Sequence, residues 1–281
     1  WRGACLWGLA SGIGFGVSEG IMYSADTYNG ISGVDAYVVR FISCVALLIF
    51  GVWFPAPFRE LAGGTRLFWI IIGVDAVCGP FLTWLLFNRS KSRLALTVDI
   101  GLVIAIQLAA LAYGMYALSL SRPLAMVYEV DRFRLISYAD VEEAEGTTVP
   151  DWAHPWRVSD VRVVGTRTAT TLDEKLNSVE ASLQGVEPSQ RPEWWQDYAQ
   201  SVPRVLQRER PLAELRQKHP TEQGILDSAV KQALADVRPG ETTDAAQLRW
   251  LPLVSRRAMN WVVLLDPSTA RPRGYAALDG F

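Results

Sequence analysis

Long apolar runs fill the first 120 positions of the chain, and shorter apolar runs separated by charged segments follow them. The runs at 67–87 and 95–118 each have the roughly 20 apolar residues that a helix needs to cross a hydrocarbon core about 30 Å thick. Two more apolar runs occupy 4–23 and 37–54. The pattern therefore predicts an α-helical N-terminal half with about four transmembrane helices.

The second half of the chain reads as a small soluble α+β domain. Apolar residues at helical spacing predict helices over 172–184 and 221–237, and Pro203 and Pro211 are expected to break the helical stretch between them. Short apolar runs bounded by turn residues predict strands at 125–130, 133–137, 161–166, 248–254, 260–266 and 274–278.

A basic turn, NRSKSR, separates the runs at 67–87 and 95–118 and carries Arg89, Lys91 and Arg93. A short cationic turn resists translocation, so we expect it in the cytoplasm and the soluble domain on the opposite side of the membrane. The loop at 24–36 has no Lys or Arg, so the charge rule gives no support to the orientation before residue 50.

Polar residues inside the two apolar runs fall at matching depths. Asp75 matches Gln107, and Thr83 matches Asp99, which predicts two contacts between helices worth about 1 kcal/mol or less each. These contacts either fix the packing of the two helices or recognise another membrane helix. Pro80 removes a backbone hydrogen bond and predicts a kink in the first helix.

Composition excludes several classes of function. The net charge of −2 gives no reason to expect nucleic-acid binding. His154 and His219 are far from each other and from any Cys, so we expect no metal site. No nucleophile elbow, phosphate loop or dinucleotide fingerprint is present, and we therefore expect neither a cofactor nor an enzyme.

Tryptophans supply the remaining candidate side chains. Trp53 precedes two prolines and suits a membrane interface. Trp194 and Trp195 are predicted to begin an amphipathic helix, where they act either as core or interface anchors or as a ligand-stacking pair. The second possibility leaves a periplasmic ligand-sensing membrane protein as an alternative function.

From about residue 50 to 281 the chain resembles the type IV pilin accessory proteins of the TfpX/TfpZ kind. The matching segments are FGVWFPAPFRELAGG, LFWIIIGVDAVCGPFLTWLLFN, QLAALAYGMYAL, SRPLAMVYEVDRFRLI, RPEWW, RPLAEL, LRWLPLV and WVVLLD. The resemblance implies a chaperone-like factor of the bacterial inner membrane, with a periplasmic domain, that assists assembly of a cognate major pilin. The expected partners are that pilin, the lipid bilayer and other pilus-assembly proteins of the inner membrane. The candidate partner-binding residues are Trp53, Asp75, Pro80, Asp99, Gln107, Trp194 and Trp195.

Residues from about 12 to 47 are similar to a segment of the PrsW-type intramembrane proteases, with Glu19 at the position of an active-site glutamate. The chain lacks the EExxK motif and reads Leu-Leu-Ile at 47–49 where that family has a His-containing helix. An intramembrane peptidase is therefore an alternative function that we expect to be inactive. We expect three segments: 1–48 as an N-terminal membrane segment, 49–120 with helices at 37–54, 67–87 and 95–118, and 121–281 as the periplasmic domain.

Overall fold

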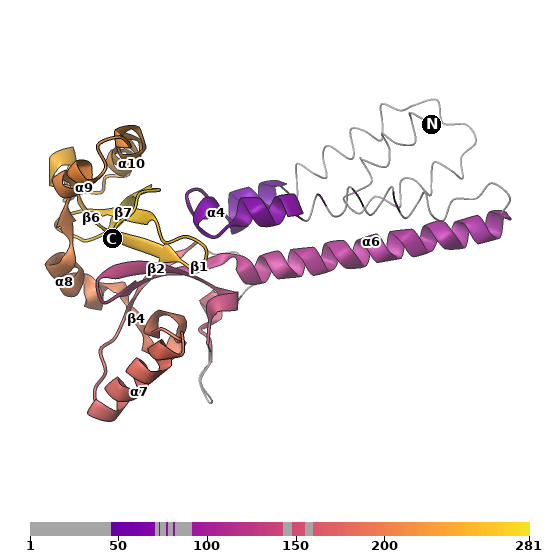
Figure 1. Cartoon of the computed structure of the whole chain (residues 1–281), viewed down its shortest axis with the longest axis horizontal. Coiled ribbons are helices and arrows are strands. Elements are labelled where there is room, and N and C mark those ends of the chain that lie inside the picture. Colours follow the sequence, from indigo (N-terminus) through magenta and orange to yellow (C-terminus); the bar gives the residue numbers. More distant parts are fainter. Residues whose placement is uncertain are drawn as a thin grey trace. The chain divides into compact units, whose positions relative to one another are not determined.

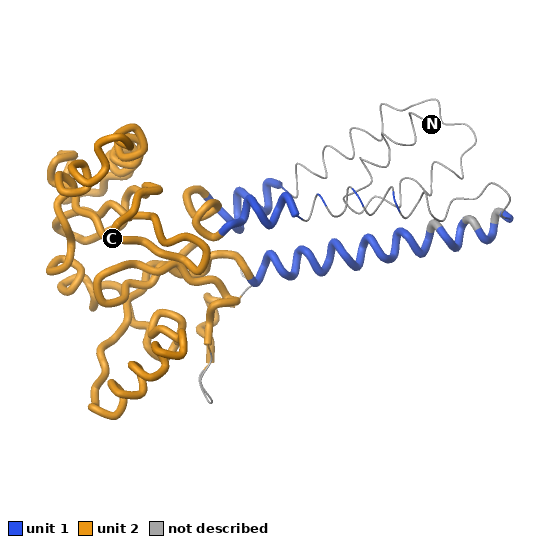
Figure 2. The backbone as a smooth tube through the Cα atoms, viewed as in Figure 1, with its two compact units in different colours: residues 1–55, 63–120 blue, residues 56–62, 121–281 orange. Residues whose placement is uncertain are grey.

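The structure is a computed structural model that describes residues 46–70, 73, 77, 81, 92–142, 148–154 and 160–281. The chain divides into two compact units (Figure 2). Unit 1 comprises Trp1–Pro55 and Gly63–Leu120, and unit 2 comprises Ala56–Ala62 and Ser121–Phe281. Glu19, which carries the protease resemblance, lies outside the described residues.

One long apolar helix dominates the described part of unit 1. Helix α6 runs over Arg93–Ser121, and its section Thr97–Ser121 is long and apolar enough to cross a membrane, by length and composition. Its 25 residues span roughly 37 Å at 1.5 Å per residue. No other helix among the residues that the structure describes meets this test.

The expectation of a helical half with about four transmembrane spans is therefore wrong, because the structure gives one candidate span among the residues that it describes. The described end of the run at 37–54 is α-helical at 46–47 and continues as a π-helix, η1 (Leu48–Trp53). Pro55 and Pro57 follow it, and proline prevents the chain from continuing as a helix. The run at 4–23 and most of the run at 67–87 lie outside the described residues.

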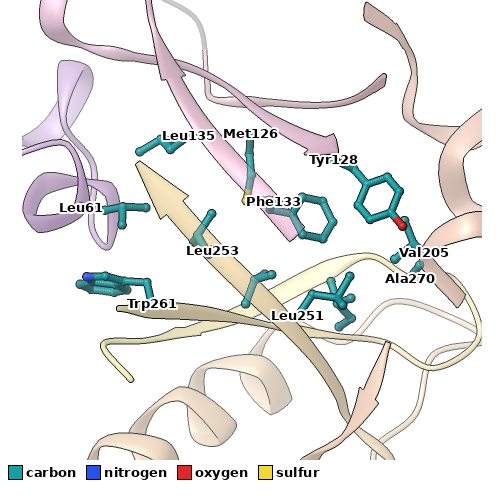
Figure 3. Close-up of a cluster of buried hydrophobic side chains, with 12 residues drawn as sticks. Leu61, Met126, Tyr128, Phe133, Leu135, Val205, Leu251, Leu253, Trp261 and Ala270 are labelled. Carbon is teal, nitrogen blue, oxygen red and sulfur yellow. The ribbon is translucent and has the colours of Figure 1, made fainter. Parts of the chain in front are cut away.

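Residues 56–62 lie between the apolar runs at 37–54 and 67–87 in the sequence, but they belong to unit 2. Residues 56–62 contain helix α4 (Phe58–Leu61), and Leu61 is fully buried. Figure 3 shows its side chain in one cluster with Leu253 and Trp261. The Phe58 ring packs edge-on against Tyr275, with centroids 5.3 Å apart. A remote stretch of sequence thus completes the core of unit 2.

Unit 2 is built on a mixed eight-stranded sheet with the order β4-β3-β1-β2-β6-β7-β8, and β5 also pairs with β6 (Figure 1). β1 pairs in parallel with β3, β2 pairs in parallel with β6, and the other pairs are antiparallel. The strands are β1 (Pro123–Glu129), β2 (Arg132–Ser137), β3 (Arg162–Thr166), β4 (Trp195–Asp197), β5 (Arg210–Pro211), β6 (Arg249–Ser255), β7 (Trp261–Leu265) and β8 (Pro272–Ala276). All six predicted strands are present, and β4 and β5 were not predicted.

Alternating residues of the central strands belong to two hydrophobic clusters on opposite faces of the sheet. In β7, Trp261 and Val263 join the cluster beneath α4 and α8 (Tyr198–Arg208), whereas Val262 joins the cluster beneath α9 (Leu212–Lys218) and α10 (Gln223–Ala235). Successive side chains of a strand point to opposite faces, so one strand can supply both clusters. Helices therefore cover both faces of the sheet, which fixes a rigid platform.

The remaining helical elements lie in the connections. Helix α7 (Leu172–Leu183) follows β3, and α8 continues through Pro203 instead of breaking there. Burial of Ser201 and Val205 on either side of Pro203 offsets the one backbone bond that proline removes. The short 3-10 helices are η2 (Tyr138–Asp140), η3 (Asp151–Ala153), η4 (Pro188–Gln190), η5 (Pro192–Trp194) and η6 (Ala245–Gln247).

Candidate functional site

Helix α7 exposes an apolar face. Leu172, Leu176, Val179 and Leu183 follow one another at intervals of four, three and four residues, which places them on one side of the helix. They are 71, 57, 53 and 84% exposed, and no residue of α7 is buried. Figure 1 shows α7 standing apart from the sheet of its own unit. A contiguous exposed apolar surface typically marks a site of interaction with a partner.

Polar contacts stabilise both ends of α7. At the start, the Thr171 hydroxyl accepts a hydrogen bond of 3.1 Å from the backbone N–H of Glu174. The Glu174 carboxylate accepts one of 2.5 Å from Nη2 of Arg167. At the end, the Ser182 hydroxyl donates to the Glu187 carboxylate at 3.0 Å. The helix is thus positioned without burial of its apolar face.

Arg167 links α7 to the body of unit 2. Its Nε donates to the carbonyl oxygen of Glu193 at 3.0 Å, and its guanidinium lies 4.5 Å from the centroid of the Trp194 ring. The hydrogen bond from Arg167 lowers the pKa of Glu174 to about 2, so this carboxylate is charged at neutral pH. Glu174 lies in the first turn of α7, where the helix dipole stabilises a negative charge.

The structure places Trp194 and Trp195 inside unit 2. Trp194 ends η5 and is 4% exposed, and Trp195 begins β4, so the predicted amphipathic helix does not start here. The Trp195 ring stacks on Trp152 with centroids 5.5 Å apart, and its Nε1 donates to the carbonyl oxygen of Ser189 at 2.8 Å. These contacts favour anchors of the fold over a ligand-stacking pair.

The candidate residues of unit 1 are only partly visible. Gln107 is buried in α6 and Asp99 is half-buried in the same helix. Trp53 is buried at the end of η1. Asp75, Pro80 and Thr83 lie outside the described residues, so the two predicted polar contacts stay predictions.

A cluster of charged side chains lies between α10 and the edge of the sheet at β8. Arg273 donates from Nη1 to Asp266 at 3.2 Å, and Arg271 donates from Nε to Glu241 at 2.6 Å. Burial alone would raise the pKa of Asp266, but hydrogen bonds from Ser268 and nearby backbone amides outweigh it and lower that pKa. Paired charges with internal partners lock elements together, and we interpret this cluster as structural.

The two histidines do not come together. His154 is exposed, whereas His219 contacts Glu222 at 2.7 Å and the carbonyl oxygen of Asp279 at 2.8 Å. Among the described residues, no group of His, Cys, Asp and Glu side chains could hold a metal ion.

The exposed face of α7 is a candidate surface that sequence reasoning missed. The spacing of its apolar residues predicted the helix, but spacing is the same for a helix that packs on a core and for one that awaits a partner. Polar flanks such as those of α7 occur around both kinds of helix, so no local pattern identified the exposed face.

Known proteins with a similar sequence place the chain in a family. Residues 42–63 match the family described as Fimbrial assembly protein FimB. The fimbrial assembly protein of serogroup E1 from Dichelobacter nodosus is 34% identical over 238 residues, which cover 84% of this chain and 90% of the relative. The corresponding protein of serogroup I is 33% identical over 84% of this chain and 90% of the relative.

A third relative, the fimbrial assembly protein of serogroups C1 and C2 of the same organism, is 41% identical over 40% of this chain and 86% of its own length. No solved structure matches the chain. The residues that match the family description include α4, whose Leu61 lies in the core of unit 2. With two relatives above 30% identity along nine-tenths of their length, this chain belongs to the fimbrial assembly protein family.

Proposed function

We propose that this chain assists assembly of a type IV pilus by binding its cognate major pilin, as its resemblance to the TfpX/TfpZ-type accessory proteins implies. The accessory role in fimbrial assembly follows from the family. The pilin as direct partner and the chaperone-like mechanism are the finer part of the proposal. The observation that supports them best is the exposed apolar face of α7.

Exposure of this face is energetically unfavourable, and a partner would relieve it. Full burial of an aliphatic side chain contributes about 1.5–3 kcal/mol, so four such residues can support specific binding even when they are only partly covered. An amphipathic helix commonly binds a partner through residues at this spacing. The pair of Glu174 with Arg167, whose Nε donates to the carbonyl oxygen of Glu193, ties the start of the helix to unit 2 before binding, which lowers the entropic cost of association.

Helix α6 supports a place in the bacterial inner membrane, with unit 2 in the periplasm. Large apolar side chains of α6 are exposed, among them Leu94, Val98, Leu102 and Ile106. Such side chains suit contact with lipid or with the apolar helix of a partner. The basic turn that precedes α6 in the sequence favours a cytoplasmic start for this helix. A chaperone-like factor at this place would hold the apolar helix of the pilin in the bilayer before assembly.

Pilus counts in a strain that carries charged α7 variants test the proposal. The double variant Leu176→Glu/Val179→Glu should lower surface pili about tenfold or more, because it replaces two apolar contacts with charges. Asn177→Glu adds a charge to the polar side of the same helix and should leave pili unchanged. Variant protein levels should match the wild type, since neither Leu176 nor Val179 is buried. Normal piliation with Leu176→Glu/Val179→Glu would overturn the role of α7.

A further inference from the structure

A cavity of about 340 Å³ in unit 2 lies at two of the three points where the chain passes between unit 1 and unit 2. Its lining includes Ala62, the last residue of the inserted segment, and Ser121, the first residue after unit 1. Every lining residue belongs to unit 2, and Ala62 and Ser121 place the cavity at the junctions 62/63 and 120/121 of the chain. A liquid-like water occupies about 30 Å³, so the cavity has room for a group well beyond a single small ion.

Cations outnumber acids around this cavity. Arg256 and Arg257, both exposed, line it from the turn between β6 and β7. Asp140 is the acidic group in the lining, with its Oδ1 3.6 Å from Nη1 of Arg256. Its Oδ2 already accepts hydrogen bonds from the backbone N–H and the hydroxyl of Ser137, at 3.0 and 2.6 Å.

We propose that this cavity binds the phosphate headgroup of an anionic phospholipid. Two guanidinium groups at one mouth can donate several charge-assisted hydrogen bonds to phosphate oxygens. The inference rests on the membrane placement of α6 proposed above. Helix α6 ends at Ser121, so this residue lies where the helix leaves the hydrocarbon, and the cavity that it lines lies at headgroup depth.

The same turn offers an apolar contact beside its two arginines. Met259 is 66% exposed and lies three residues after Arg256. An apolar side chain next to cations is the pattern of segments that enter the interface of an anionic membrane. The turn would thus hold the membrane-facing edge of unit 2 against the lipid surface.

Native mass spectrometry of the full chain in detergent, with added phosphatidylglycerol, phosphatidylcholine or inorganic phosphate, tests this inference. We expect phosphatidylglycerol to be retained over phosphatidylcholine. Arg256→Gln/Arg257→Gln should weaken that binding about 30-fold, at about 1 kcal/mol for each arginine near a membrane surface. Lys231→Gln/Arg238→Gln removes the same charge from residues outside the cavity lining and should have little effect. Ala139→Trp, at an exposed lining residue, should block the cavity without a change of charge.

Three results would overturn the inference: equal retention of both lipids, full binding by Arg256→Gln/Arg257→Gln, or equally tight binding of inorganic phosphate, which would make this a small-anion site. Carbonate washing of cell membranes distinguishes a failure of the lipid site from a failure of the proposed membrane placement of α6. Release of the chain by carbonate would overturn the placement of α6 and this inference together. Retention in the membrane without lipid preference would overturn the inference alone.

Discussion

Gly165 shows how closely one residue of the sheet approaches a helix. It lies in β3, and a Cβ added there would overlap the Ser201 hydroxyl and approach the Ser201 Cβ to 2.6 Å. We expect Gly165→Ala to destabilise the protein by about 2 kcal/mol, because α8 cannot move away from β3 without loss of its own packing. The measurement is thermal unfolding of the full chain in detergent.

Gly224 provides the matched control. It lies in α10, and a Cβ added there would meet nothing within 4 Å. Gly224→Ala should be neutral or stabilising by up to about 1 kcal/mol, because alanine favours the helix. Equal stability of the two variants would contradict the close packing of β3 on α8.

Glu209 predicts a pH dependence of stability. Its side chain is 10% exposed, and Arg249 lies 3.5 Å away. Burial raises the pKa of Glu209 from 4.5 to about 7, although Arg249 opposes the shift. The folded protein therefore holds this proton more tightly than the unfolded chain, and stability is lost as pH rises from about 4.5 through about 7.

Glu209→Gln should remove this loss. Relative to the wild type, the variant should gain on the order of 2 kcal/mol in free energy of unfolding between pH 5 and pH 8. Denaturant titrations of both proteins at the two pH values measure the difference. A stability difference that does not change with pH would show that Glu209 is ionised in the folded protein throughout this range.

At the scale of elements, the packing of α4 into the core of unit 2 is the least expected feature. Leu61→Ala should cost about 2–5 kcal/mol, because it empties a fully buried position in the core of unit 2. Leu183→Ala is the same substitution at a side chain that is 84% exposed and should change the free energy of unfolding little. Thermal unfolding of the two variants would contradict the docking of α4 if the losses were equal.

The strands of unit 2 were predictable, and the packing of α4 was not. Short apolar runs such as 260–266 identify strands through local residue preference and turns, and β7 lies there. Leu61 joins a cluster with Leu253, and its carbonyl oxygen accepts a hydrogen bond from the Ser255 hydroxyl 194 positions later, and no local pattern encodes such packing. The aromatic and proline residues before α4 also suit a membrane interface and give no sign that the segment packs into unit 2. The exposure of α7 escaped prediction for a related reason, because a periodicity does not say which surface it meets.

At the scale of the molecule, composition separated an apolar half from a charged half and anticipated the mixed α and β content of unit 2. It overstated the number of membrane spans, because apolar length alone does not establish a span, and one helix among the described residues is long and apolar enough to be one. Of the candidate partner-binding residues, the structure buries Trp53, Gln107 and Trp194. Buried side chains are poorly placed for a soluble partner, so the exposed α7 is the better candidate surface on unit 2.

The most direct test of the central claim is photocrosslinking from α7 in cells that express the cognate major pilin. A crosslinking amino acid at Leu176 should form an adduct with the pilin, because this residue lies in the middle of the exposed face. The same group at Asn177 provides the control on the polar side of the helix, and it should give a much weaker adduct. A pilin adduct from Leu176 that disappears with Val179→Glu is the result that we predict. Absence of any pilin adduct from Leu176, in cells that make normal pili, would contradict the account.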